Sequence, residues 1–229
     1  MLFRSAPLYA RLFDLGGDKP APFLADVPEE NPSLGFRGSR LLLAEPDLLA
    51  AQARALARAS IETPICVVYP MIVDLEQFLL LREIVRQQTA DIAGARLTHA
   101  PMFEVPSACL AAEELFEAAD AACIGTNDLI QYLFAVDRNN ERVANDYHPD
   151  RPVFWKVLTG LVRAAERYGK PLSLCGELGA QPKYVPRLIE IGIRRVSVSP
   201  RRVGLARAAA LRALRRAARH GINAATAAV

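Results

Sequence analysis

The chain has 229 residues, of which 52% are hydrophobic, and its formal net charge at pH 7 is +3. This length and apolar content predict a globular protein and argue against global disorder. The slight charge does not suggest a nucleic-acid-binding protein, and no apolar run approaches the roughly 18 residues of a membrane span. Four widely spaced cysteines without a CxxC pair predict free thiols, so we expect a cytoplasmic protein.

Strand-like and helical runs alternate from one end of the chain to the other. The expected strands are short apolar runs without alternation, at 8–15, 65–71, 100–104, 121–125, 171–175 and 195–199. The run at 35–43 is expected to be a short strand that enters a helix. The expected helices lie at 46–60, 75–93, 107–118, 151–168, 184–191 and 205–219. We expect Asp150 to cap the helix that begins at Arg151. The tail at 221–229 is expected to fray.

Seven β-α repeats predict an α/β fold with a parallel sheet covered on both faces. Such a sheet is either an open doubly wound sheet or a (β/α)8 barrel of the TIM type. The barrel is favoured because polar side chains that could bind a ligand or take part in catalysis follow nearly every strand. A barrel brings the carboxyl ends of all its strands to one mouth. These side chains belong to Asp14, Arg37, Glu104, Asn127, Asp128, Cys175 and Glu177. We expect a single domain over residues 1–229.

The most informative segment follows the strand at 121–125. It presents the amide of Asn127, the carboxylate of Asp128 and, ten residues later, the guanidinium of Arg138. Aspartate supplies a hard oxygen for a divalent metal, asparagine can donate to an anionic oxygen, and arginine can grip a phosphate with two hydrogen bonds. The alternative is that Asn127 or Asp128 merely caps a helix.

Two carboxylates, Glu104 and Asp128, follow consecutive predicted strands. Together with water and substrate oxygens they would suit Mg2+, which prefers oxygen ligands. The alternative is that both carboxylates cap helices at the rim of the barrel. The pair therefore indicates a magnesium site without requiring one.

Three arginines, Arg11, Arg37 and Arg138, lie near these carboxylates in the predicted barrel. Together they would form a phosphate clamp beside a metal, as phosphoryl transfer requires. The alternative for each is a structural ion pair, for example Arg11 with Asp14 or Arg138 with Asp137.

Cys175 ends a predicted strand and is followed by Gly176, which leaves room for a ligand beside the thiol. A thiol at the end of a strand and beside such a space can act as a proton donor or as a nucleophile. The alternative is a buried apolar cysteine. The glycine-rich turn at 16–19 favours anions, but it lacks the spacing of a Walker A loop.

Five of these motifs occur in order along the chain. They are RLFDLGGDK at 11–19, EENPSLGFR at 29–37, EVPSA at 104–108, GTNDLIQY at 125–132 with DR at 137–138, and CGEL at 175–178. Together they resemble the C-terminal phosphoenolpyruvate (PEP)-binding barrel of the PEP-utilising enzymes. This family includes enzyme I of the sugar phosphotransferase system and its nitrogen-related paralogue.

The resemblance implies a barrel that binds PEP and Mg2+ and cleaves PEP to pyruvate. The phosphoryl group would pass to a histidine supplied by another domain or chain. Residues that match the family's metal ligands are Glu104 and Asp128. Residues that match its phosphate or carboxylate contacts are Arg11, Arg37, Asn127 and Arg138. Cys175 matches the acid that protonates the enolate.

The sequence also departs from the family pattern. It has no counterpart of the phospho-histidine domain or of the domain that docks the carrier protein. Only Met1–Pro7 precede the strand that matches the family's second one, so we count seven strands of eight. The barrel could close through Met1–Pro7, through a partner chain or not at all, and we expect a homo-oligomer, a dimer. Gln181 stands near a position that is acidic in the family.

Three other interpretations stay open. The chain could be a PEP-sensing or interaction module without catalysis, which the lack of an acceptor histidine favours. It could be a Mg2+-dependent lyase or aldolase for oxo acids, although Arg37 and Cys175 in their motifs argue against this. It could also be a poorly folded remnant.

Overall fold

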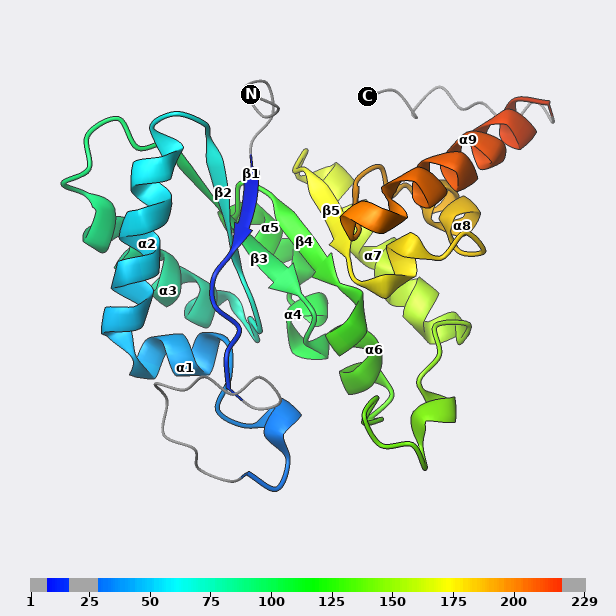
Figure 1. The fold of residues 1–229 in the computed structure, drawn as a ribbon, viewed down its shortest axis with the longest axis horizontal. Coiled ribbons are helices and arrows are strands. Elements are labelled where there is room, and N and C mark those ends of the chain that lie inside the picture. The colour runs from blue at the N-terminus through cyan, green and yellow to red at the C-terminus, as the bar shows by residue number, and fades with distance from the viewer. Residues whose placement is uncertain (1–7, 17–28, 220–229) are drawn as a thin grey trace. The chain divides into compact units, whose positions relative to one another are not determined.

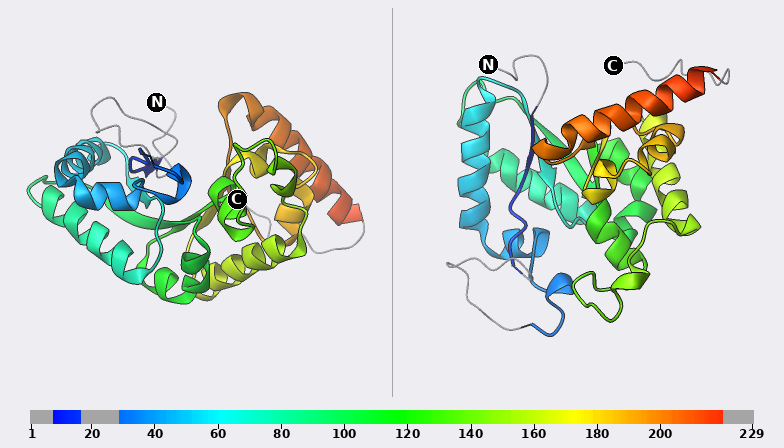
Figure 2. Two further views of the ribbon diagram at one scale, coloured as in Figure 1. Left: turned by 90° about the horizontal axis from the view of Figure 1, so that it is seen from below. Right: turned by 45° about the vertical axis from the view of Figure 1, so that its right-hand side comes forward.

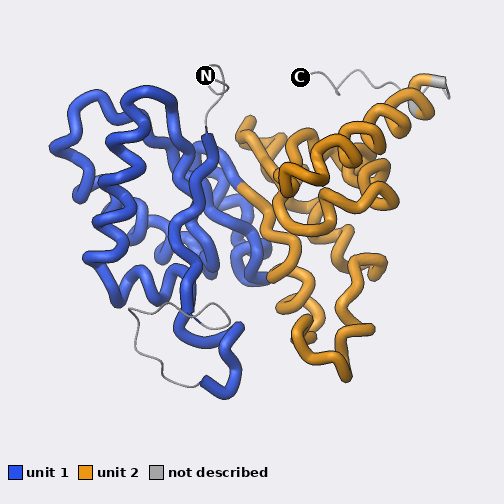
Figure 3. The backbone as a smooth tube through the Cα atoms, in the orientation of Figure 1, with its two compact units in different colours: residues 1–122 blue, residues 123–229 orange. Residues whose placement is uncertain are grey.

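The computed structural model describes residues 8–16 and 29–219. The expectations for Met1–Pro7, for the end of the glycine-rich turn and for the tail at 221–229 lie outside these residues. The chain divides into two compact units, residues 1–122 and residues 123–229 (Figure 3). We describe each unit by itself, and the single domain expected from the sequence stays a prediction.

The first unit contains three parallel strands: β1 (Leu8–Arg11), β2 (Ile65–Tyr69) and β3 (Leu97–Phe103) (Figure 1). The middle strand pairs with both of the others, and all five of its residues are buried. This burial agrees with its non-alternating apolar sequence, which is typical of a parallel strand covered on both faces.

The helices of the first unit follow its strands. They are α1 (Ser39–Ala44), α2 (Pro46–Ser60), α3 (Leu75–Thr89), α4 (Pro106–Leu110) and α5 (Ala112–Ala118), and a 3-10 helix spans Pro32–Leu34. Helices α2 and α3 pack against each other (Figure 2). Asp74 caps α3, since its Oδ1 accepts a hydrogen bond of 2.8 Å from the amide of Gln77.

The short strand expected to enter a helix within 35–43 is reduced to a single bridge, and the helix that it was expected to enter is confirmed as α1. Arg37 forms only an isolated antiparallel bridge with Gly16, and the chain then enters α1 at Ser39. Gly38 adopts a φ of 55°, which interrupts an extended backbone at the point where the strand was expected to continue. The apolar run after it becomes a buried helical stripe instead.

The second unit contains β4 (Ala122–Gly125), which begins at the unit boundary, β5 (Leu172–Cys175) and β6 (Val196–Ser197). Strands β5 and β6 are parallel, with Cys175 opposite Ser197. The helices are α6 (Thr126–Leu133), α7 (Pro152–Arg167), α8 (Val185–Glu190) and α9 (Val203–Arg219), with 3-10 helices at Ala144–Asp146, Glu177–Ala180 and Pro200–Arg202. Helices α8 and α9 pack together.

The cap expected at Asp150 is also wrong. Helix α7 has Arg151 at its N-cap, without a side-chain hydrogen bond, and Pro152 occupies the first turn. Asp150 instead accepts a hydrogen bond of 3.0 Å from the Tyr184 hydroxyl, and its Oδ2 lies 3.7 Å from Nζ of Lys183. Asp150 therefore ties the loop before α7 to the start of α8.

The fold is α/β of the TIM-barrel type, as predicted. Its strands alternate with helices, and the described residues hold six strands, one fewer than the sequence suggested. A complete barrel of this type has eight. Among the described residues, no helix combines the length and the hydropathy that spanning a membrane requires.

A buried polar pair lies in the core of the first unit. The hydroxyl of Tyr69 on β2 lies 2.7 Å from Nδ1 of His99 on β3, and the amide of His99 donates a hydrogen bond of 2.8 Å to Oδ2 of Asp120. Burial lowers the pKa of the His99 imidazole to about 4 from its usual 6.5, although Asp120 acts in the opposite direction. His99 is therefore neutral in the folded protein at neutral pH.

The folded protein should lose stability as the pH falls from about 6.5 to about 4. Folding lowers the pKa of His99. In this pH window the unfolded chain therefore binds a proton that the folded chain does not bind, and protonation favours the unfolded state. The loss should reach about 3 kcal/mol. Urea unfolding across this window checks it, with His99→Gln as the variant that cannot titrate. The account is wrong if wild type and variant lose stability equally.

Candidate functional site

Two arginines and one aspartate form a cluster at the end of β1 in the first unit. The Arg37 side chain is fully buried, and its Nε and Nη2 donate hydrogen bonds of 3.2 and 2.8 Å to the two carboxylate oxygens of Asp14. Arg11 adds a third bond, from Nη1 to Asp14 Oδ2, at 3.3 Å. The Arg11 side chain is 43% exposed. The alternative ion pair of Arg11 with Asp14 thus exists, and Arg37 shares the same carboxylate.

Glycine allows the two segments of this cluster to meet. Gly16 has a φ of 87°, and a Cβ at this position would lie 2.1 Å from the Phe36 carbonyl oxygen. The amide of Gly38 donates a hydrogen bond of 3.2 Å to the carbonyl of Leu15. The segments that carry Asp14 and Arg37 are therefore joined through their backbones as well as through their side chains.

Glu104, directly after β3, holds the backbone at the end of β2. Its Oε1 accepts a hydrogen bond of 2.7 Å from the amide of Met71, and only 1% of Glu104 is exposed. Ser39 donates a hydrogen bond to the carbonyl of Pro70. Met71 has a φ of 54°, which is unusual for a residue with a side chain, so these contacts fix a backbone turn that would otherwise be unfavourable.

The Met71 turn and the Arg37–Asp14 pair are neighbours. A Cβ placed on Gly38 would lie 2.7 Å from Cγ of Met71 and 3.2 Å from Oδ1 of Asp14. Glu104, Met71, Gly38 and Asp14 therefore form one continuous network. The first unit brings together three of the predicted site residues, which are Arg11, Arg37 and Glu104.

In the second unit, Asn127 and Asp128 lie in the first turn of α6, and neither caps it, because Gly125 is the N-cap. Asp128 is 6% exposed, and its Oδ1 lies 3.5 Å from Nη1 of Arg138. The carboxylate of Asp137, the alternative partner, accepts a hydrogen bond of 2.9 Å from the amide of Asn139. The predicted carboxylate and guanidinium are thus direct partners.

Cys175 lies at the carboxyl end of β5, beside the start of α6. Its thiol donates a hydrogen bond of 3.3 Å to the carbonyl of Ile124, and its own carbonyl accepts one of 2.9 Å from Oγ1 of Thr126. The residue is partly exposed, unlike Cys66 and Cys123, which are buried as predicted for core cysteines. The wholly buried alternative for Cys175 therefore does not hold.

Gly176 lets the strand end approach α6 closely. It has a φ of 106°, and a Cβ there would lie 2.3 Å from Oγ1 of Thr126 and 2.8 Å from Oδ1 of Asn127. That same Oδ1 accepts a hydrogen bond of 3.1 Å from the amide of Glu177. The side chain of Asn127 is thus held beside Cys175 by the backbone that follows the strand.

An open hollow of about 800 Å³ lies at this strand end. We call it the Cys175 hollow, and its polar lining consists of Asn127, Cys175, Glu177, Gln181, Ser197, Ser199 and Arg202. Its size suits a small-molecule ligand. The second unit therefore brings Asn127 and Cys175 together at one concave surface.

Tyr147 is a member of this region that the sequence analysis did not identify. Its hydroxyl donates a hydrogen bond of 3.1 Å to the carbonyl of Asn127. Burial raises the pKa of the Tyr147 hydroxyl, and the nearby Arg138 partly offsets this. Its sequence neighbourhood reads only as a loop, so no signal in the sequence pointed to this contact.

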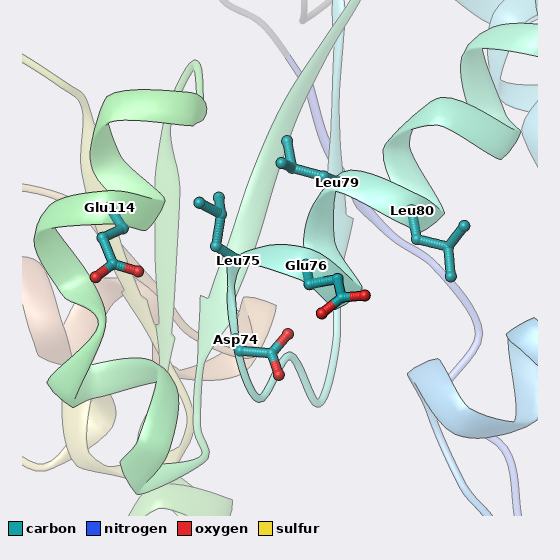
Figure 4. A pocket seen from close by; sticks show the side chains of 6 residues that line it. All are labelled: Asp74, Leu75, Glu76, Leu79, Leu80 and Glu114. Carbon is teal, nitrogen blue, oxygen red and sulfur yellow. The ribbon is translucent and has the colours of Figure 1, made fainter.

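The first unit also has an open pocket of about 650 Å³ beside the start of α3 (Figure 4). Three leucines and the carboxylates of Asp74, Glu76 and Glu114 line it. Three negative charges would repel a phosphate or carboxylate ligand. This pocket is therefore not a candidate site for the anion that the arginine motifs predict.

The metal ligands expected from the sequence lie in different units, Glu104 in the first and Asp128 in the second. Within the described part of the chain, no cluster of three or more His, Cys, Asp or Glu residues is placed to hold a metal ion. Both side chains offer carboxylate oxygens, the ligand type that Mg2+ prefers, so their chemistry fits the ion. Their joint role stays a prediction.

The two units thus define an α/β protein of the barrel class with arginines, carboxylates and a thiol at its strand ends. Residues 2–215 match the family described as PEP-utilising enzyme, PEP-binding domain, and the chain belongs to this family.

Two relatives illustrate the match. The chain is 39% identical over 210 residues to the phosphoenolpyruvate-protein phosphotransferase of Geobacillus stearothermophilus, covering 88% of this chain and 36% of the relative. It is 36% identical over 203 residues to multiphosphoryl transfer protein 1 of Escherichia coli K12, covering 86% and 24%. The chain therefore spans about a third or less of the length of these relatives.

Solved structures share the fold at low sequence identity. A citrate lyase from Burkholderia xenovorans has a TM-score of 0.55 and 16% identity, over 70% of this chain and 53% of that one. RipC from Yersinia pestis has a TM-score of 0.55 and 12% identity, over 90% and 77%. At these identities the likeness shows the fold alone.

Replacing Asp14 by asparagine should destabilise the protein by about 3–5 kcal/mol, because it removes the carboxylate that faces the buried Arg37 guanidinium. Chemical denaturation of the full chain measures the change. Asp91→Asn is the matched control, since Asp91 makes a similar bidentate pair with Arg54 at the surface. The control should cost far less, because solvent screens an exposed pair. Equal costs would contradict the account.

Gly176→Ala should destabilise the second unit and displace the Asn127 side chain, because the new methyl group would overlap two side-chain oxygens. Gly169→Ala is the control. It also has a positive φ, but its Cβ would meet nothing within 4 Å. The Gly176 variant should cost at least about 1 kcal/mol more than the control in thermal or urea unfolding. Similar costs would mean that the close approach at Gly176 is unimportant.

Proposed function

We propose that the chain binds PEP together with Mg2+ as the PEP-binding part of a PEP:protein phosphotransferase. The family supports PEP as the ligand, and the names of the relatives support phosphoryl transfer to a protein. The whole reaction needs a histidine from another domain or chain, and we expect the phosphoryl group to pass to it. The expected dimer and a cytoplasmic location stay predictions.

The observation that carries this proposal is the cluster of Arg11, Asp14 and Arg37. Two guanidinium groups bond to one carboxylate, which places two cationic groups side by side. Arg37 is fixed in place by its two bonds to Asp14, while Arg11 remains partly exposed. A fixed positive charge beside an accessible arginine suits a ligand with a phosphate and a carboxylate. In this proposal Arg11 and Arg37 bind PEP.

The second unit supplies the other proposed contacts. Asn127 would donate from its amide nitrogen, since its Oδ1 already accepts from Glu177. Arg138 would bind the phosphate or carboxylate of PEP beside its partner Asp128. Glu104 and Asp128 would hold Mg2+, which when bound neutralises charge on the phosphoryl group. The carboxylate chemistry of both residues supports this assignment.

Cys175 is the proposed acid. When the bond between phosphorus and the enol oxygen breaks, the phosphoryl group joins a nitrogen of the acceptor histidine and leaves the enolate of pyruvate. The thiol of Cys175 then gives its proton to the methylene carbon, forming pyruvate, and the thiolate regains a proton from water. The partial exposure of Cys175 and its position in the Cys175 hollow support this role.

A second candidate function is PEP sensing without catalysis. One observation favours it: His99 is buried against Tyr69 and is therefore unsuited to carry a phosphoryl group. The two functions differ in one result. Adding a phospho-histidine domain should produce pyruvate from PEP if the chain is part of a phosphotransferase, and should produce none if it only senses PEP.

Calorimetric titration of PEP into the purified chain tests the proposed function. We expect saturable binding that requires Mg2+. Asp128→Ala should weaken it at least about tenfold, because the variant loses a proposed metal ligand. Asp146→Ala is the control, since this aspartate pairs with Arg151 in the same unit and has no proposed role. The proposal fails if the folded chain does not bind PEP, or if both variants bind it as wild type does.

A further inference from the structure

The second unit has another hollow, at the amino end of β5 rather than at its carboxyl end. It measures about 300 Å³ and lies between the end of α7, the start of β5 and the turn that precedes β6. Its charged lining consists of Glu166, Lys170, Arg194 and Arg195. We call it the basic hollow. Nothing in the proposed PEP chemistry uses these residues.

The charges around the basic hollow do not balance. Among the described lining residues three are cationic and one is anionic, an excess of two formal positive charges. In the described part of the chain, the side chains of Lys170 and Arg195 make neither a hydrogen bond nor an ion pair. Both cations are therefore available to an anion that enters the hollow.

The third cation is held in position. Nη1 of Arg194 donates a hydrogen bond of 2.7 Å to the carbonyl of Ile189, near the end of α8. This bond orders the Arg194 guanidinium against the end of α8. Because the group is already ordered, binding an anion there costs less side-chain entropy than binding at a mobile arginine.

Lys170 and Arg195 each precede one of two neighbouring parallel strands. Strands β5 and β6 are parallel neighbours, and the amide of Leu174 donates a hydrogen bond of 3.0 Å to the carbonyl of Arg195. Lys170 lies two residues before β5 begins, and Arg195 lies one residue before β6. Because Leu174 is opposite Val196, Arg195 lies level with Ser173, and Lys170 precedes that point by three residues, about 10 Å along the chain. Both residues line the hollow from different positions along the strand.

The remaining walls are apolar, and Val162, Ala165 and Leu172 contribute to them. Gly192 has a φ of 104°, and a Cβ there would lie 2.8 Å from Cγ1 of Val162, so the turn before β6 packs closely against α7 at this point. The hollow thus offers a short apolar floor beside a cationic rim. These features suit a small ligand with a dianionic group and a short carbon skeleton.

We propose that the basic hollow is an accessory binding site for a small organic phosphate. It is separate from the Cys175 hollow, because Leu172 at the start of β5 lines one and Cys175 at the end of β5 lines the other. The two ends of this strand are about 10 Å apart at the usual rise per residue. This accessory site uses none of the residues proposed to bind PEP, so a result against PEP binding would not count against it.

Inorganic phosphate is the probe, followed by the backbone amide signals of Gly169 and Gly192 in NMR spectra at constant ionic strength. Wild type should show saturable shifts at both amides. Lys170→Gln combined with Arg195→Gln should weaken the apparent affinity at least about tenfold, because two phosphate contacts are lost. Lys156→Gln combined with Arg163→Gln removes the same charge from exposed positions of α7 outside the hollow, and this control should bind as wild type does.

Three outcomes would overturn the proposal. Shifts at Gly169 and Gly192 that never saturate would show only general ionic effects. Equal weakening in the two double variants would show a response to net charge rather than a site. Shifts confined to Gly176 would place phosphate in the Cys175 hollow alone. An unchanged Gly176 amide signal in each variant without phosphate verifies that the unit remains folded.

Discussion

The buried pair of Arg37 and Asp14 is the interaction on which the first unit's part of the site depends. Removing a guanidinium from water is costly unless a carboxylate meets it with good geometry, and Asp14 does so with both oxygens. The pair ties the segment after β1 to the segment before α1. Gly38 then lies against Met71, whose amide Glu104 holds. Replacing Asp14 would therefore affect Glu104, a proposed metal ligand, in two ways. It would change the local charge, and it would shift the backbone at Gly38 and Met71.

The second unit positions its chemistry in a similar way, by joining side chains to the backbone of a neighbouring segment. Thr126 binds the carbonyl of Cys175, Asn127 binds the amide of Glu177, and the Cys175 thiol binds the carbonyl of Ile124. These reciprocal contacts lock the start of α6 to the end of β5. Groups held in this way need little reorganisation when charge develops on a ligand, which is what electrostatic catalysis requires.

Sequence patterns predicted those parts of the molecule that local forces decide. Helix α2 matches its expected bounds, because Pro46 favours a helix start and an apolar stripe follows it. Tertiary contacts decided the rest. The short strand expected before the helix within 35–43 is reduced to a bridge at Arg37, because Gly38 has a positive φ. Tyr147 contacts Asn127 across a loop, and Arg138 pairs with Asp128 where its neighbour Asp137 was the alternative. The spacing of apolar residues in the sequence does not indicate such tertiary contacts.

The proposed function requires that residues of both units respond to PEP in a Mg2+-dependent way. Hydrogen exchange with residue resolution tests it most directly, at the Met71 amide, which Glu104 binds, and at the Glu177 amide, which Asn127 binds. With PEP and Mg2+ present, both amides should exchange more slowly, while amides in the middle of α2 should keep their rates. Unchanged exchange at both amides, or slowing that is equally strong without Mg2+, would contradict the claim.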